Sequence, residues 1–447
     1  MLVLIVLLGF TTLAQLLFAI PMPQVFIRWF EIGFAGFFLF EAARSYKAPI
    51  LKPAVGWLFL AWFGFATVSV VLAVHPAPAL IRHAEWTTHF LFAFSLWHYL
   101  QRHPASIKIL FLIIPVGFML VGLNMAGAWL SLISPRDYNW FEGIPLVGHV
   151  RHLGYYGLAA LIVSGGLLLG FGEKATWPKR LLVLGSLAIC WGVLFWTGGR
   201  AAIGSGVLAL AFIVWFAEKD RRASIAGIFI VAAALGLWLS MVFLVNDPRM
   251  GFLFSLQRTV ADTSALGVDG FTTGRLTIWG VALRNLEGHF LFGLGPDGYR
   301  FIEEHHHGIQ PHGMPVQVLV EWGLVGAVPF LILLGLVFWK GFLYLCQERD
   351  PLLRTARIIA YAVMAGSTVH SIVDGLYYHA QPLLFLFTCF AVVLLPVAPV
   401  RSFHTPHPIL KLLTARRTLW VLIALLVFIF FANTGWIHLW FVRTFGG

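Results

Sequence analysis

Three side chains in the sequence have the chemistry to bind and activate an anionic substrate: Arg200, Arg275 and His312. Arg200 follows a Thr-Gly-Gly turn at a predicted helix start, where free backbone N–H groups and the helix dipole also favour an anion. Arg275 stands near the start of a short predicted helix, for which Thr272 or Thr273 is the expected N-cap. An arginine guanidinium binds phosphate oxygens bidentately. His312 can exchange a proton near neutral pH, as a general base acting on a hydroxyl must.

A second set of polar residues is expected to contact the same substrate. Arg151, His152 and Tyr155 stand where a charged and aromatic loop enters a predicted helix. Gln317 follows the candidate histidine closely, and Asp374 precedes an aromatic turn, where it either orients an arginine or the acceptor, or caps a helix. For the arginines, the structural alternative is pairing with carboxylates of the same loops, which include Asp137, Asp247, Asp262 and Asp269.

The elements that position these residues are predicted to be membrane helices. The chain is 60% hydrophobic and 11% charged, with a mean hydropathy of +0.86, too apolar for a water-soluble domain. Apolar runs of about 20 residues, each able to cross the hydrocarbon core, recur at 2–20, 25–43, 54–74, 79–100, 107–134, 153–171, 181–198, 201–218, 224–246, 314–339, 358–378, 380–397 and 418–440. We therefore predict an all-α polytopic membrane protein.

The distribution of lysine predicts the orientation of these helices. All eight lysines fall in alternate connections, while every basic residue in the remaining connections is arginine. By the positive-inside rule the lysine-bearing side and the N-terminus are cytoplasmic, and the arginine-only side faces out of the inner membrane into the periplasm. Two outer loops are long, 135–152 and 247–313, and loops of that length are usually functional.

The chain divides into three parts on this interpretation. Residues 1–134 are N-terminal transmembrane helices, and residues 135–400 form a core that contains both long outer loops. Residues 401–447 contain a cytoplasmic basic loop and a last helix that crosses the membrane or lies in its interface.

Several classes of site are not expected. The net charge of +11 lies in short clusters between apolar runs, which argues against nucleic-acid binding. The run His305-His306-His307 before His312 is not expected to hold a metal, because adjacent histidines cannot all face one ion and no carboxylate-rich spacing accompanies them. The three cysteines lack paired spacing, and no nucleotide-binding loop is present. We predict neither a metal nor another cofactor.

The sequence resembles the O-antigen ligase/polymerase family of membrane glycosyltransferases. The resemblance lies in the order and spacing of Thr-Gly-Gly-Arg200, Thr-Gly-Arg275-x-x-x-Trp279, Gly293-x-Gly-Pro, Pro-His312-Gly-x-x-x-Gln317 and Glu321-Trp-Gly-x-x-Gly326. It extends over about 150–400, whereas the first 130 or so residues share only the topology. The family is similar to other inverting, metal-independent, lipid-linked glycan transferases of the GT-C type.

The resemblance implies a donor, an acceptor and residue roles. The donor is a glycan linked to undecaprenyl diphosphate within the membrane, and the acceptor is a hydroxyl of lipid A–core or of another glycan. Arg200 and Arg275 would hold the diphosphate, and His312 would assist the attacking hydroxyl. Two departures stand out. The usual His-Asn pair is His312-Gly313 here, and the predicted thirteenth helix exceeds the twelve that ligases generally have.

Ligase activity is the first hypothesis because one dominant outer loop carries both Arg275 and His312. A polysaccharide polymerase and then a protein O-oligosaccharyltransferase are the alternatives within the family. From a different class, a secondary transporter should show an internal repeat and midplane charges, and no repeat is visible. The charges inside predicted spans are Arg28, Glu31, Arg82 and Glu85, which either lie in the interface, pair between helices or line a lipid entrance.

Overall fold

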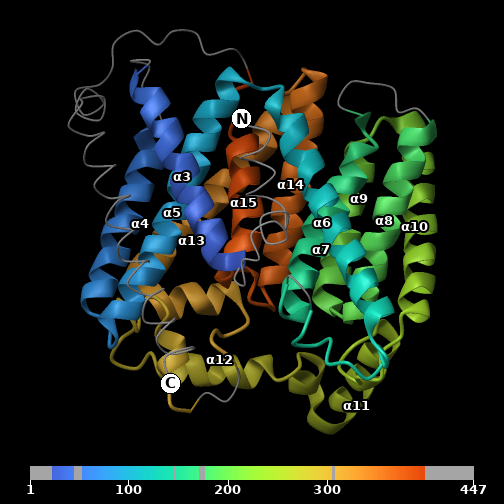
Figure 1. Ribbon diagram of the computed structural model, residues 1–447. Helices are drawn as coiled ribbons and strands as arrows, with labels where there is room; N and C mark the ends of the chain where they lie inside the picture. The colour runs from blue at the N-terminus through green and yellow to red at the C-terminus, as the bar shows by residue number, and fades with distance from the viewer. Residues whose placement is uncertain (1–22, 45–52, 145–146, 171–176, 305–307, 398–447) are drawn as a thin grey trace.

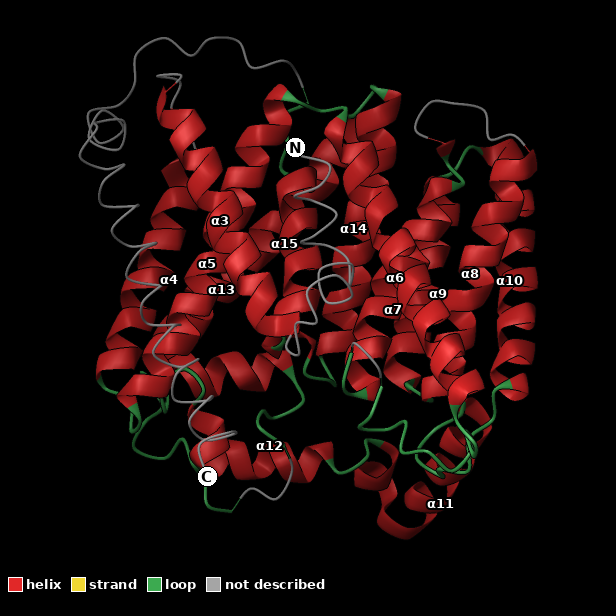
Figure 2. Ribbon diagram, in the orientation of Figure 1, coloured by secondary structure: helices red, strands yellow, loops and turns green. Residues whose placement is uncertain are grey.

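The computed structural model describes residues 23–44, 53–144, 147–170, 177–304 and 308–397. Over these ranges the chain is helical without a strand, and its β structure is limited to an isolated bridge between Ile144 and Gly148. Figures 1 and 2 show a bundle of long helices with two further helices, α11 and α12, lying across one end. The prediction of an all-α polytopic membrane protein is confirmed.

The helices of the bundle are, in chain order, α3 (Pro23–Arg44), α4 (Pro53–Val71), α5 (Pro76–Arg102), α6 (Ser106–Ser131), α7 (Val150–Leu167), α8 (Trp177–Thr197), α9 (Arg200–Phe216), α10 (Arg222–Val242), α13 (Met314–Gln347), α14 (Pro351–Ser371) and α15 (Ala380–Val393). Between α10 and α13 the chain forms α11 (Phe252–Phe271), α12 (Arg275–Arg284) and the short 3-10 helix η3 (Gly298–Phe301). Two other 3-10 helices are η2 (Lys219–Arg221) and η4 (Leu376–Tyr378).

Each predicted span within the described residues corresponds to one helix of the bundle. The spans predicted at 2–20 and 418–440 lie outside the described residues, as does 401–447. The largest boundary errors are at α13, which continues to Gln347, and at α14, which begins at Pro351. Asp350 explains the early start of α14, because its side chain accepts a hydrogen bond from the Leu353 N–H at 2.9 Å and Pro351 occupies the first turn.

Length and composition suit a membrane in four of the described helices: Ser106–Ser131, Arg180–Thr197, Lys219–Val242 and Met314–Gln347. Shorter apolar helices, such as Arg200–Phe216 and Ala380–Val393, lie among them. Helix α15 is buried along almost its whole length against α5 and α14. The bundle therefore shields some of its helices from lipid with others.

The longer of the two predicted outer loops, between α10 and α13, is attached to the bundle where α13 bends. At Gly323 the backbone leaves helical geometry, with φ 59° and ψ −170°. The freed N–H groups of Leu324 and Val325 donate to the carbonyls of Phe290 and Leu291 at 3.0 and 3.1 Å. A Cβ on Gly323 would lie 2.4 Å from the Gly293 nitrogen, so the close approach of the two backbones requires glycine. The bend leaves these N–H groups of α13 without helical acceptors, and the loop supplies carbonyl acceptors for them.

The described lysines agree with a division between the two ends of the bundle. Lys108 starts α6, Lys219 starts η2 and Lys340 lies in the last third of α13. Figure 1 shows the connection between α9 and α10, which contains η2, at the end of the bundle opposite α11 and α12. The assignment of that end to the cytoplasm remains a prediction.

Candidate functional site

His312 is held in a specific and strained position immediately before α13. Its φ is 51°, in the left-handed region that residues with a Cβ seldom adopt. The side chain of Gln310 supports this turn, because its Oε1 accepts from the His312 N–H at 2.7 Å and its Nε2 lies 2.8 Å from Nδ1 of the ring. Only 7% of His312 is exposed. The imidazole is therefore oriented by its immediate neighbours in sequence.

Residues from α7 and from the turn after α14 surround the imidazole. Nη1 of Arg151 lies 3.0 Å from Nε2 and 3.2 Å from Nδ1 of His312. Oδ1 of Asp374 lies 3.5 Å from Nδ1. The Tyr155 hydroxyl donates to the same carboxylate oxygen at 2.9 Å. We call these four residues the histidine site.

The surroundings of the histidine site keep His312 neutral and Asp374 charged. Burial lowers the pKa of His312 below its ordinary value, the charge of Asp374 opposes this shift, and the charges of Arg151 and Arg275 add to it. Burial alone would raise the pKa of Asp374, but hydrogen bonds from His312 and His370 hold that pKa well below the usual range of a carboxyl. At neutral pH the site therefore presents a neutral imidazole beside a carboxylate, the arrangement of a general base with an orienting acid.

Arg275 and Arg200 meet at the turn that leads into α12. Arg275 donates from Nε to the carbonyl of Val373, the residue before Asp374, and from Nη1 to the Thr272 carbonyl at 3.0 Å. Arg200 donates to the hydroxyl of Thr273, at the same turn, and to that of Thr259 on α11. The two positive charges are close enough to repel each other. Among the residues that the structure describes, no carboxylate is bonded to either arginine, and such a pair of cations is suited to an anionic group such as a diphosphate.

The prediction that Thr272 or Thr273 is the N-cap of α12 is wrong. Arg200 is the first residue of α9, as predicted, and Arg275 is the first residue of α12, but the N-cap of α12 is Gly274 and its φ is 75°. The carboxylate of Asp269 replaces the threonine cap, since it accepts from the N–H groups of Leu276 and Thr277 at 3.0 and 3.3 Å. An acceptor from the preceding helix thus leaves the threonines free for other roles.

Gly313 explains why the residue after the histidine differs from the expected asparagine. A Cβ at this position would lie 2.8 Å from Nε1 of Trp279. That indole is held in place by its own hydrogen bond to the Pro311 carbonyl at 3.0 Å. The space that an asparagine side chain would need is already occupied by the tryptophan ring.

Two of the predicted binding residues lie apart from these contacts. The ring of His152 packs against His379 with centroids 4.3 Å apart, at the edge of the histidine site. Gln317 is buried and donates to Oε1 of Glu321 at 3.0 Å. Direct roles for both in substrate binding remain predictions.

Two residues near the histidine site were not predicted as site residues. Gln310 orients His312, as described above, and His370 places Nε2 3.5 Å from Oδ2 of Asp374. The spacing of His370 and Asp374, one helical turn, is a local signal that could have paired them. No comparable signal marks Gln310, because its bonds depend on the left-handed turn at His312.

Metal ligands do not cluster in the part of the chain that the structure describes. No group of three or more His, Cys, Asp or Glu side chains there could hold a metal ion. His305, His306 and His307 lie outside the described residues. A metal-independent reaction remains a prediction.

Comparison with known families identifies the segment that contains both arginines and the histidine. Residues 185–331 match the family model described as O-antigen ligase. The chain has an O-antigen ligase domain. No curated protein sequence matches the chain.

The O-antigen ligase domain extends from α8 into the bent part of α13. It supplies Arg200, Arg275 and His312, whereas Arg151 and Asp374 come from segments on either side of it. The domain confirms the predicted resemblance to this family, and it supports a membrane enzyme that transfers glycans as a ligase or polymerase. The histidine site is therefore assembled by the O-antigen ligase domain together with α7 and the turn after α14.

Proposed function

We propose that the protein transfers a glycan from undecaprenyl diphosphate to an acceptor hydroxyl on the periplasmic face of the inner membrane. The observation that carries the proposal is the buried His312, which faces Asp374 and lies near an arginine pair to which no carboxylate is bonded within the described residues. A glycosyl transfer needs these two functions, a base for the acceptor and cations for the leaving diphosphate.

In this reaction His312 takes the proton of the acceptor hydroxyl. The hydroxyl oxygen attacks the anomeric carbon and forms the new glycosidic bond while the bond from that carbon to the diphosphate oxygen breaks. The electron pair leaves with the diphosphate, whose growing charge Arg200 and Arg275 stabilise. Attack from the face opposite the leaving group inverts the anomeric configuration. Asp374 orients the imidazole and stabilises the imidazolium that forms.

O-antigen ligation to lipid A–core is the favoured form of this activity, and polymerisation of repeat units is the second. The ligase is favoured because one loop, between α10 and α13, carries both Arg275 and His312 and lies across the end of the bundle (Figure 1). The base and one of the two proposed diphosphate-binding arginines therefore belong to one segment, and Arg200 joins them from the start of α9. A protein hydroxyl as acceptor is the third candidate.

Deletion of the gene followed by gel analysis of lipopolysaccharide separates these acceptors. A ligase predicts lipid A–core without O-antigen, and a polymerase predicts lipid A–core with a single repeat unit. Unaltered lipopolysaccharide together with a shifted glycoprotein band would indicate protein glycosylation. Unaltered lipopolysaccharide and unaltered glycoproteins in the deletion strain would contradict the proposed activity.

Asp374→Asn is expected to reduce kcat on the order of 100-fold and to move the acid limb of the pH–rate profile to lower pH. Asp374 raises the pKa of His312, so its neutralisation lowers that pKa further. His312 acts in its neutral form, and a lower pKa means that protonation stops the reaction only at a lower pH. The measurement is the transfer rate against pH in proteoliposomes.

Asp262→Asn is a suitable control, because this carboxylate lies on α11, in the loop that carries His312, and has no hydrogen bond to the described residues of the histidine site. Its pH profile should match that of the wild type. An unchanged acid limb in Asp374→Asn would show that the carboxylate does not act on the titrating base.

Gly313→Ala is expected to lower kcat about 10- to 100-fold, because a shift of about 1 Å in a catalytic group has effects of this size. The new Cβ must displace either the Trp279 indole or the backbone next to His312. Gly280→Ala on α12 is the matched control, since its Cβ would have no neighbour closer than 3.5 Å. Equal activity in the two variants would mean that the tryptophan does not constrain the histidine.

A further inference from the structure

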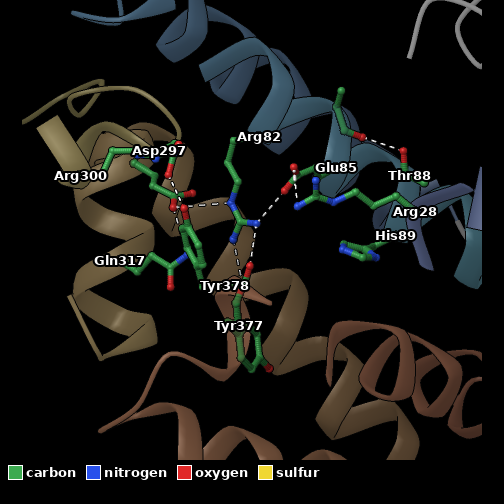
Figure 3. A network of polar contacts seen from close by, with 12 residues as sticks. Arg28, Arg82, Glu85, Thr88, His89, Asp297, Arg300, Gln317, Tyr377 and Tyr378 are labelled. Atoms are coloured by element: carbon green, nitrogen blue, oxygen red, sulfur yellow. Dashed lines mark hydrogen bonds and ion pairs between the residues drawn. The ribbon is translucent and has the colours of Figure 1, made fainter. Parts of the chain in front are cut away.

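Arg82 on α5 lies at the centre of a buried polar network (Figure 3). Its side chain is 5% exposed. Nη1 lies 3.0 Å from Oε2 of Glu85 on the same helix, and Glu85 in turn pairs with Arg28 of α3 at 2.8 Å. The sequence left the role of these charges open, and the structure shows that they pair within and between helices.

The guanidinium of Arg82 also holds the backbone of the turn that contains Asp374. Nη1 donates to the Tyr378 carbonyl at 2.9 Å and Nη2 to the Tyr377 carbonyl at 3.1 Å. The ring of Tyr378 packs on the guanidinium, with its centroid 4.4 Å from Cζ. Both carbonyls belong to the short turn, including η4, between α14 and α15. Arg82 therefore fixes the far end of the segment that begins at Asp374.

A second set of contacts joins Arg82 to the outer loop. Nε lies 3.9 Å from Oε1 of Glu321, beside the bend of α13, and α13 begins two residues after His312. The hydroxyl of Tyr378 donates to Asp297 at 2.5 Å, at the start of η3. The segments on either side of the histidine–aspartate pair thus converge on one guanidinium.

The network around Arg82 contains as many carboxyl groups as guanidiniums. Three carboxylates, those of Glu85, Asp297 and Glu321, face three guanidiniums, those of Arg28, Arg82 and Arg300. A buried ion network of this kind contributes little net stability compared with apolar packing. Its distinctive property is geometric, because the planar fork of arginine fixes two carbonyls at once.

We infer that Arg82 is a positioning residue of the transfer reaction, which holds the turn after α14 so that Asp374 stays in register with His312. The inference rests on the proposed function. It goes beyond that function because Arg82 touches neither the histidine nor the candidate diphosphate-binding arginines. Arg275 bonds the Val373 carbonyl before Asp374, whereas Arg82 bonds the two carbonyls at the far end of the turn, so the main effect of Arg82 is expected on the catalytic step.

Arg82→Lys tests the inference, because lysine keeps the positive charge for Glu85 and Glu321 but cannot bond both carbonyls as the fork does. The matched control is Arg357→Lys on α14. Arg357 is equally buried, donates to the carbonyls of Val393 and Leu395, and pairs with Glu348, but it lies at the opposite end of the bundle. Purified variants in proteoliposomes are compared for thermal unfolding, kcat, KM for the lipid-linked donor and the pH–rate profile.

Arg82→Lys should lower kcat about 100-fold at unchanged KM and move the acid limb to lower pH, as Asp374→Asn does. Displacement of Asp374 removes a negative charge that faces His312, while Arg151 of α7, Arg275 of α12 and His379 of the same turn still face it. Arg357→Lys should lose similar thermal stability but keep the wild-type kcat and pH profile.

The outcomes separate this inference from the proposed function. Wild-type protein without transfer activity would overturn the function itself. An active wild type, an inactive His312→Ala and an Arg82→Lys variant that behaves like Arg357→Lys would overturn only the inference. If Arg82→Lys fails to accumulate, Glu85→Gln gives the same test, since it weakens the anchor of the guanidinium without removing the fork. A kcat loss and a pH shift in Glu85→Gln would support the inference, and their absence would overturn it.

Discussion

Replacing His312 with alanine should lower glycan transfer by roughly 10²- to 10⁴-fold, the usual contribution of a general base. The imidazole is 7% exposed and neutral at physiological pH, so it can accept the acceptor proton without first losing one to solvent. The variant should insert in the membrane normally and should bind the donor as the wild type does. The measurement is the single-turnover rate with purified lipid-linked donor in proteoliposomes.

His289→Ala provides the matched control for this experiment. His289 lies in the same loop as His312, between α12 and η3, and it is exposed. Its loss should leave the rate within about twofold of the wild type, as is usual for surface substitutions. Near-wild-type transfer by His312→Ala would sink the assignment of His312 as the base.

Arg275→Ala should lower kcat by about 10²- to 10³-fold, the range seen when one charge-stabilising donor is removed from an active site. Burial lowers the pKa of Arg275, but the guanidinium remains charged at neutral pH. Its loss removes a cation from the leaving diphosphate and also the hydrogen bond to the Val373 carbonyl, beside Asp374. Arg275→Lys should recover only part of the rate, because lysine lacks the bidentate fork.

Arg284→Ala is the control, since Arg284 is the last residue of the same helix and is exposed. Steady-state kinetics with varied donor separate the effects on kcat and KM. A rise in KM at wild-type kcat would reassign Arg275 from the transition state to ground-state binding. Equal activity of the two alanine variants would remove Arg275 from the site.

The helices could be predicted from sequence because their cause is local. Each long apolar run becomes one helix, and glycine turns such as the one before Arg200 mark where a helix starts. The grouping of Arg200, Arg275 and His312 could also be predicted, because topology alone places their segments at one end of the bundle. The family motifs then supplied the chemistry.

The contacts within the site could not be predicted, because the residues that form them are far apart in the chain. Arg82 bonds carbonyls nearly three hundred residues away, and no periodicity records such a pair. The N-cap of α12 was mispredicted for a related reason. Asp269, on the preceding helix, competes with the threonines for the free N–H groups and replaces them. Local propensity gives way where a neighbouring element offers a better acceptor.

The spacing of Arg82 and Glu85 has a consequence for how the protein is made. A helix that enters the membrane with a lone arginine or glutamate carries a large insertion penalty. Arg82 and Glu85 stand one turn apart and contact each other at 3.0 Å, so α5 brings its own counter-ion with it. The helix can therefore be inserted before α13 and the loop between α10 and α13, which follow it in the chain, have been made to complete the network. We therefore expect Glu85 to neutralise Arg82 during membrane insertion and to hold its guanidinium in place in the folded protein.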